Sequence, residues 1–184
     1  THFASHDIDI FGCISNLDNS KNSGKHALRN LGKDLAQELI RNKINVVSLD
    51  ASGDSFWIAE GLLLTSYRYN KLLSKNASTA WSLKELEIIG LSIEESQKLS
   101  SISAAVNEAR DLVNAPLLTL SAENLSERIE ELGEEFGFST TILNQTKIES
   151  LKMGGLLGVN KGSVDPATFS ILEHKPQNCV NERP

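Results

Sequence analysis

The chain has 184 residues, with 24 acidic and 18 basic side chains that give a net charge of −6. This length fits one or two domains, and a hydrophobic content of 40% is ordinary for a globular protein. The acidic balance excludes a general affinity for nucleic-acid phosphates, because no basic surplus is available to release counterions. The longest strongly apolar run, residues 58–65, is too short to span a membrane.

The cysteine usage indicates a reducing compartment. Cys13 and Cys179 lie far apart, and the chain is not cysteine-dense, so a disulfide framework is not expected. No charged and then apolar leader opens the chain, although its first residue is not methionine and the natural start is left open. We therefore expect reduced thiols in a cytoplasmic protein.

The first ninety residues alternate between strand and helix patterns. Leucines spaced by three and four residues predict a helix over 26–41, and alternating β-branched residues predict a strand over 44–50. A second helix over 55–73 is apolar on more than one face, which is typical of burial on both sides. Further strands are predicted at 8–14 and within 77–89. This order of elements predicts an α/β fold.

A long helix is predicted to follow Gly90. Ser92 and Glu95 have the spacing of a capping box, in which each residue binds the backbone N–H of the other. Pro116 cannot continue a helix and disfavours helical backbone at the preceding residue, so the helix ends near Asn114. A helix of about twenty residues is roughly 30 Å long, which suits a connector between two domains.

A second α/β unit is predicted from about residue 114. Ser121 can cap a helix, and Gly137 supplies the left-handed residue that ends it. The elements predicted beyond this helix are strands at 138–144, 156–160 and 168–174 and a short helix over 145–152. Because sheets usually hold about five or six strands, these elements are expected to be part of a larger domain.

Few residues have the spacing of a known phosphate or metal motif. Gly24 and Lys25 precede a helix as in a phosphate-binding loop, but Asn19 stands where that motif needs glycine and His26 where it needs Ser or Thr. The cysteines form no Cys-x-x-Cys pair and no His-Glu-x-x-His sequence occurs, so no metal site is predicted. The chain's histidines are His2, His6, His26 and His174.

The remaining candidate residues have simpler structural interpretations. Ser163 follows a glycine but lacks the Gly-x-Ser-x-Gly surroundings of a nucleophilic serine. Six glutamates between Glu123 and Glu135 fall mostly opposite the leucines of their helix, which is typical of a solvated face. Asp50 ends a strand, where α/β sheets bind ligands, although an Asp there is more often a turn residue. The aromatic residues interpreted as core or interface packing are Trp57, Trp81, Tyr67 and Tyr69.

Several segments in order resemble the leucyl aminopeptidase family, the cytosolic two-metal exopeptidases. The family opens its catalytic domain with Ala-Arg-x-Leu-Val-Asn-x-Pro, and residues 109–116 have this pattern. Residues 153–163 match a Met-Gly-small-Leu-Leu stretch that leads to Gly-Ser. Residues 169–176 resemble the family's next strand and turn, and residues 59–75 resemble a helix of its N-terminal domain.

The resemblance implies an enzyme that removes N-terminal residues from peptides, holds two divalent metal ions (Mn or Zn) and assembles as a hexamer. It covers about residues 25–184 and is strong over 105–176. The family's metal ligands follow this region, in Gly-Lys-Gly, Phe-Asp-x-Gly-Gly and Asn-Thr-Asp-Ala-Glu-Gly-Arg stretches that this chain does not contain. We therefore name no catalytic or metal-binding residue and expect the chain alone to be inactive, with no metal bound by its own residues.

The joint near Pro116 departs from the family pattern. The family commonly continues with Pro and Asn and later Thr-Pro, whereas this chain has Leu117 and Leu118 and then Ser121 and Ala122. Serine keeps the capping hydrogen bond and alanine is a good first-turn residue, so the expected fold is unaffected. Any role of the missing Asn in fixing the joint is left open.

The combined interpretation is an α/β protein with a partial macro-like N-terminal domain. We expect that domain over residues 1–91, a linker helix over 92–114, and the beginning of the peptidase domain over 115–184. Peptides are the expected substrates of the whole enzyme, and neither nucleic acid nor a membrane is an expected partner. The alternatives are a stand-alone macro-like module for nucleotide or ADP-ribose binding or for oligomerisation, and a structural fragment whose exposed sheet edge pairs with another copy.

Overall fold

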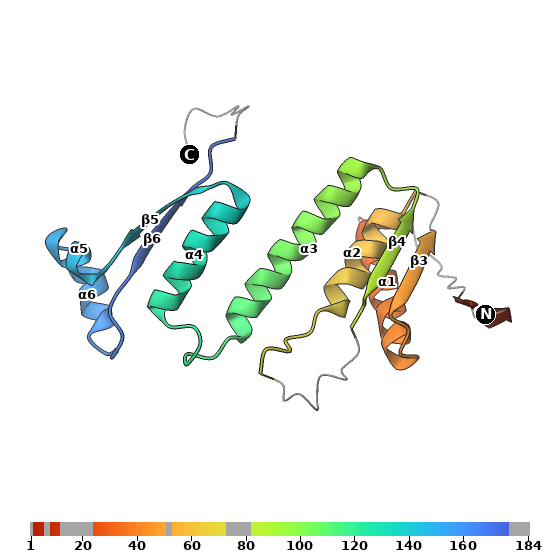
Figure 1. Cartoon of the computed structure of the whole chain (residues 1–184), viewed down its shortest axis with the longest axis horizontal. Helices are drawn as coiled ribbons and strands as arrows, with labels where there is room; N and C mark the ends of the chain where they lie inside the picture. Colours follow the sequence, from red (N-terminus) through yellow and green to blue (C-terminus); the bar gives the residue numbers. More distant parts are fainter. Residues whose placement is uncertain (1, 6–7, 12–23, 51–52, 73–81, 177–184) are drawn as a thin grey trace. The chain divides into compact units, whose positions relative to one another are not determined.

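The computed structural model of the chain describes residues 2–5, 8–11, 24–50, 53–72 and 82–176. The chain divides into two compact units, Thr1–Asn114 and Ala115–Pro184, and each has strands and helices of its own (Figure 1). No helix in the described ranges is both long and apolar enough to cross a membrane. Both units combine helices with small sheets, so the predicted α/β class is confirmed.

The first unit contains a parallel strand pair covered by helices. Its elements are β1 (His2–Ser5), β2 (Ile8–Phe11), α1 (Gly24–Arg41), β3 (Val46–Asp50), α2 (Ser55–Ser66), β4 (Glu85–Ile89) and α3 (Ile93–Asn114). β1 and β2 pair antiparallel, whereas β3 and β4 pair parallel with Val46 opposite Glu85. Parallel neighbours need a long crossover connection, and α2 lies within it.

Apolar side chains from α1, α2, α3 and the strands form the core of the first unit. The leucine spacing that predicts α1 is explained here, since Leu28 and Leu39 are buried and Leu31 and Leu35 pack against them. The two buried clusters are Leu28, Leu49, Phe56, Ile58, Ala59 and Leu99, and Ala36, Leu39 and Leu62.

The backbones of α1 and α2 touch at two glycines. A Cβ atom on Gly32 would lie 2.0 Å from the carbonyl oxygen of Ile58. Likewise, a Cβ atom on Gly61 would lie 2.0 Å from the carbonyl oxygen of Arg29. Distances this short are not tolerated by packed atoms, so the pair of helices requires glycine at both positions.

The second unit joins one long helix to an antiparallel strand pair. Its elements are α4 (Ala122–Phe136), β5 (Ser139–Leu143), α5 (Gln145–Ser150), α6 (Gly154–Asn160) and β6 (Phe169–Glu173). β5 and β6 pair with Ser139 opposite Glu173. α4 packs on this pair where Gly133 meets the Thr140 side chain and where the hydroxyls of Ser126 and Ser170 lie 3.3 Å apart.

The predicted helix ends are confirmed at three positions. α3 stops at Asn114, two residues before Pro116. The Ser121 hydroxyl accepts the Asn124 N–H at 3.3 Å, so it caps α4 as expected. Gly137 ends α4 in the left-handed conformation with φ of 75°.

The structure overturns two of the predicted elements. Residues 156–160, predicted as a strand, lie within helix α6. The helix predicted over 55–73 ends at Ser66, because Tyr67 adopts an extended backbone with ψ of 137°. Parts of two other predicted segments, residues 12–14 and 77–81, lie outside the described residues.

The capping box at the start of α3 predicts a measurable acid dependence. The Glu95 carboxylate accepts the Ser92 backbone N–H and the Ser92 hydroxyl, both at 3.0 Å. These two hydrogen bonds to Ser92 hold the pKa of Glu95 below its ordinary value. The stabilisation from ionised Glu95 is therefore present above the pKa of the unfolded chain and is lost as the pH falls through the lower folded pKa.

We expect an NMR titration to give a Glu95 carboxyl pKa below the ordinary value of about 4.3. In Ser92→Ala the pKa should rise toward that value without reaching it, because the hydroxyl donor is removed while the backbone N–H donor of residue 92 is kept. An unchanged pKa in Ser92→Ala would show that the capping box does not control this carboxylate.

Candidate functional site

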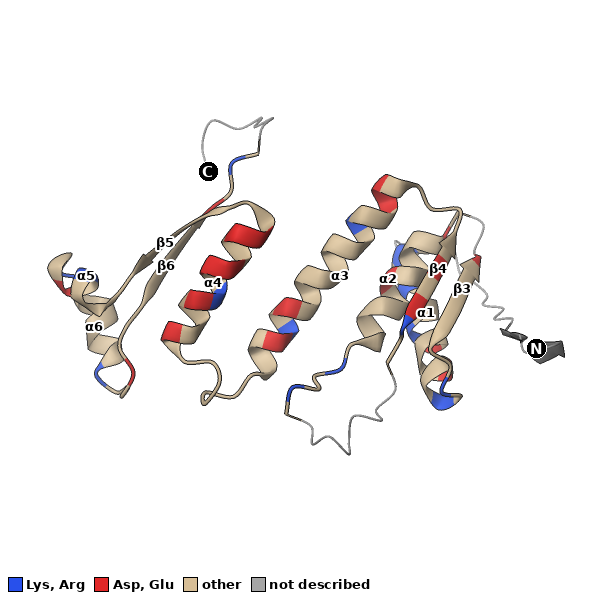
Figure 2. Cartoon of the chain, in the orientation of Figure 1, with Lys and Arg blue, Asp and Glu red and all other residues tan. Residues whose placement is uncertain are grey.

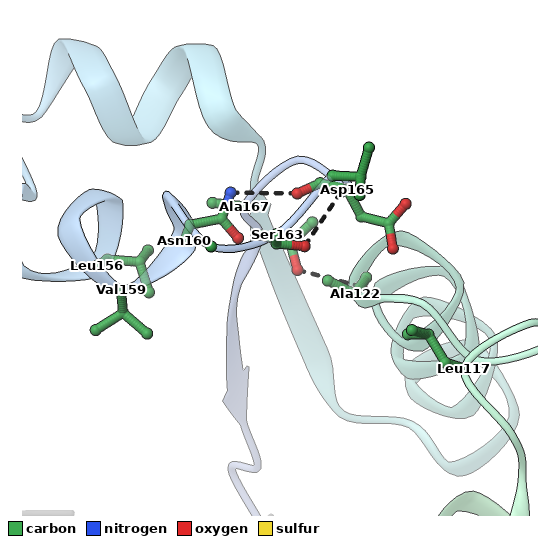
Figure 3. Close-up of a pocket in the computed structure, with 11 residues that line it drawn as sticks. Leu117, Ala122, Leu156, Val159, Asn160, Ser163, Asp165 and Ala167 are labelled. Carbon is green, nitrogen blue, oxygen red and sulfur yellow. Dashed lines mark hydrogen bonds between the residues drawn. The ribbon is translucent and has the colours of Figure 1, made fainter.

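An open cleft lies in the second unit, between the start of α4, helix α6 and the segment that leads into β6 (Figure 3). Its volume is about 610 Å³. Most of the large side chains around it are aliphatic and exposed. The lining residues are Leu117, Ala122, Leu156, Val159, Asn160, Gly162, Ser163, Val164, Asp165, Ala167 and Thr168.

The polar groups of the cleft hold its own loop in place. The Asn160 side-chain amide donates to the Asp165 carbonyl at 3.2 Å, and the Asp165 N–H donates to the Ser163 hydroxyl at 3.1 Å. The Thr168 hydroxyl donates to the Ala122 carbonyl at 3.2 Å, which ties the loop to the start of α4. The lining contains no histidine or cysteine and one carboxylate. This arrangement can accept an apolar group but offers no acid–base pair.

The residues that suggested a phosphate loop have a packing role. Gly24 is the first residue of α1. The Lys25 ammonium lies over the Trp57 ring at 4.7 Å from the ring centre, and the Arg29 guanidinium lies over the same ring at 4.6 Å. Trp57 also packs against the core and meets Phe56 edge-on, as the sequence interpretation expects.

The remaining sequence candidates are not gathered into a site. All six glutamates of α4 are exposed along one helix, where Figure 2 shows them as separate acidic patches. Asp50 is exposed at the end of β3, and Ser163, His26 and His174 are exposed as well. Other candidates lie outside the residues whose side chains the structure describes: His2, His6, Cys13, Trp81 and Cys179.

No group of three or more His, Cys, Asp or Glu side chains that could hold a metal ion occurs within the described part of the chain. The residues described therefore do not fit a two-metal centre, and no chemical step is assigned to them.

A hydrogen-bonded cluster between the end of α2 and the end of α3 was not predicted from the sequence. The Tyr67 hydroxyl donates to Asp111 Oδ1 at 2.7 Å and accepts from the Asn114 amide at 3.2 Å. The Lys71 ammonium lies 2.9 Å from Asp111 Oδ2. Arg110 donates to the Leu64 carbonyl at 2.5 Å, and its guanidinium lies 5.4 Å from the centre of the Tyr67 ring.

The cluster shifts two pKa values upward. Partial burial and the hydrogen bond to Asp111 raise the pKa of the Tyr67 phenol. The contact with the Asp111 carboxylate raises the pKa of Lys71. For both groups the protonated form is favoured in the folded protein. Their contribution to the free energy of unfolding is therefore fully present below the pKa of the unfolded chain and is lost as the pH rises through the folded pKa.

Comparison with known proteins places most of the chain in one family. Residues 107–184 match the cytosol aminopeptidase family, catalytic domain. The probable cytosol aminopeptidase of Chlorobaculum parvum is 35% identical over an alignment of 168 positions that covers 77% of this chain and 33% of that relative. The chain thus spans about a third of the length of the curated relatives it matches.

Two solved structures share the fold. The bottromycin maturation enzyme BotP in complex with Mn superposes with a TM-score of 0.71 at 23% identity, covering 85% of this chain and 34% of that enzyme. A tomato leucine aminopeptidase mutant superposes with a TM-score of 0.71 at 24% identity, covering 83% of this chain and 34% of that enzyme. Together with the catalytic-domain match, these relatives confirm the resemblance read from the sequence. The chain is therefore a member of the cytosol aminopeptidase family.

Proposed function

We propose that this chain is part of a metal-dependent aminopeptidase that releases N-terminal amino acids from peptides. The observation that carries the proposal is the match of residues 107–184 to the family's catalytic domain. It is supported by relatives, named as probable cytosol aminopeptidases, that align with most of the chain. The stand-alone nucleotide-binding module is not favoured, because these relatives extend across the first unit as well.

The finer features of the proposal follow from the family. The whole enzyme holds two divalent ions, Mn or Zn, acts on peptides in the cytoplasm and assembles as a hexamer. Residues 1–91 form a macro-like domain, residues 92–114 a linker helix, and residues 115–184 the beginning of the peptidase domain. Metal ions of this kind polarise the scissile carbonyl and activate a water molecule, and their ligands lie outside this chain.

A chimera provides the test of the proposed activity. The aligned region of the Chlorobaculum parvum relative is replaced by the corresponding residues of this chain. Hydrolysis of leucine p-nitroanilide is then measured with added Mn²⁺ or Zn²⁺. We expect turnover that a chelator abolishes, because the relative supplies the metal-binding sequence and this chain supplies the fold around it. This chain alone is expected to give no turnover under the same conditions.

The unaltered relative serves as the positive control. A chimera that folds and assembles but shows no metal-dependent turnover, while the relative is active, would contradict the proposed activity. Turnover by this chain alone would instead contradict the expectation that the metal site lies elsewhere.

A further inference from the structure

The sequence match and the structural division overlap in one segment. The family's catalytic-domain match begins at residue 107, whereas the first compact unit continues to Asn114. Residues 107–114 are thus catalytic-domain sequence that is built into the first unit, as the last turns of α3. This overlap raises the question of what binds the segment there.

The α2–α3 clasp, defined as Tyr67, Lys71, Arg110, Asp111 and Asn114, supplies the polar contacts of this segment. Three of its members come from the Ala-Arg-x-Leu-Val-Asn-x-Pro motif at 109–116, and the other two follow the end of α2. The polar residues Arg110, Asp111 and Asn114 of the motif therefore contact residues at and beyond the end of α2.

The clasp also completes the end of α2. The last carbonyl groups of a helix have no partner within the helix. The Thr65 and Ser66 hydroxyls donate to the Gly61 and Leu62 carbonyls, each at 2.8 Å, but these carbonyls lie one turn earlier and are not among the last groups. The Leu64 carbonyl is taken by Arg110, from 46 residues further along the chain. The end of α2 and the end of α3 are therefore stabilised together.

Tyr67 is the central member of the clasp. It contacts Asp111 and Asn114 through one hydroxyl, while its ring lies beneath the Arg110 guanidinium. Lys71 is 65% exposed, and an exposed ion pair of this kind contributes little. The Asp111 side chain is only 23% exposed, so its hydrogen bond with the phenol is better shielded from water.

We propose that Tyr67 and Asp111 are positioning residues that bind the leading segment of the catalytic-domain sequence, residues 107–114, to the first unit. The inference depends on the family match of this segment but not on the proposed activity. It goes beyond the proposed function, because it assigns to three residues of the motif a role in fixing the end of α3 within the first unit.

Hydrogen exchange of this chain, followed by mass spectrometry, tests the proposal without metal or substrate. In Tyr67→Phe we expect amide exchange over 107–114 to become about tenfold faster, because hydrogen bonds to a charged acceptor are among the stronger ones and local opening sets the exchange rate. Exchange over α4 should not change. The matched control is Tyr69→Phe, since the Tyr69 hydroxyl makes no hydrogen bond among the described residues, and it should leave exchange over 107–114 unchanged.

Equal exchange rates over 107–114 in the two tyrosine variants would overturn the proposal. If Tyr67→Phe does not fold, Asp111→Leu is the second test, because leucine has a similar size but cannot accept the hydrogen bond of the phenol. Faster exchange confined to 107–114 and the end of α2 in Asp111→Leu supports the clasp, and wild-type exchange in that variant overturns it.

An alkaline titration separates this role from ordinary packing. Tyr67 and Tyr69 are the two tyrosines of the chain, so Tyr69→Phe leaves Tyr67 as the single phenol that titrates. Its ultraviolet titration should have a midpoint above the ordinary value of about 10. Asp111 acts on its pKa directly, the Arg110 guanidinium lies over its ring, and Lys71 pairs with the same Asp111 carboxylate. Adding Asp111→Asn should lower the midpoint, and a midpoint that does not move would overturn the proposed Tyr67–Asp111 contact.

Discussion

Alanine in place of Gly32 is expected to destabilise the first unit by about 3 kcal/mol, near the upper end for overpacked cores. The added Cβ would lie 2.0 Å from the Ile58 carbonyl oxygen and 2.8 Å from the Leu62 nitrogen. These are backbone atoms of a neighbouring helix, so no flexible side chain can move aside to relieve the contact. α1 and α2 would have to separate, which would open the buried cluster around Leu62 and Ala36.

Urea unfolding followed by Trp57 fluorescence measures this effect. Gly24→Ala is the matched control, since it lies in the same helix and its Cβ would meet nothing within 4 Å. Gly61→Ala should give a loss similar to that of Gly32→Ala, because its Cβ meets the Arg29 carbonyl oxygen from the opposite side. A Gly32→Ala protein as stable as Gly24→Ala would show that the helices do not approach as closely as described.

Methionine in place of Arg29 is the second large effect that we expect. Glu60 is 7% exposed, and its carboxylate accepts from Arg29 Nε at 2.8 Å. Removing one partner of a buried ion pair leaves an uncompensated charge, which costs about 3 kcal/mol at a site where the arginine is partly exposed. Methionine can keep an apolar contact with the Trp57 ring, so the loss reports mainly the unpaired carboxylate.

Two further variants test this explanation by chemical denaturation. Arg29→Met combined with Glu60→Leu should recover most of the stability, because no charge then remains buried without a partner. Arg41→Met removes an exposed pair with Glu38, whose members are 70% and 48% exposed, and should change stability by at most about 0.5 kcal/mol. If the double variant is no more stable than Arg29→Met, the packing of the arginine rather than its charge is decisive.

Local signals in the sequence were sufficient for the ends of α3 and α4. Ser92, Ser121, Gly137 and Pro116 act through neighbours within a few residues, so their spacing is enough to locate the boundaries. The same holds for β3 and β5, whose alternation places one side of each strand toward its helices. The motif at 109–116 likewise indicated the family to which the chain belongs.

The two predictions that were wrong concern a segment with an ambiguous sequence pattern and a helix end that lies near a distant part of the chain. Residues 156–160 are a short apolar run with a β-branched residue, a pattern that cannot separate a strand from a buried or packed helix. Their helix starts where Leu157 N–H bonds the Met153 carbonyl, a choice that the run itself does not encode. Near the early end of α2, the Leu64 carbonyl accepts from Arg110, which lies 46 residues away and is out of reach of local sequence patterns.

The cleft of the second unit was not predicted from the sequence. The residue patterns led to no catalytic residue, and the resemblance named none, although part of the cleft's lining falls within the family stretch 153–163. The α2–α3 clasp joins Tyr67 to residues 44 and 47 positions later, a separation over which periodicity and spacing give no information.

The two buried clusters take all their members from residues before 100, whereas Leu118, Val159 and Val164 of the second unit remain exposed. Polypeptides leave the ribosome from the amino end and fold domain by domain as they emerge. The first unit can therefore bury the side chains of both clusters while the second unit is still being synthesised, because none of those side chains comes from beyond Leu99.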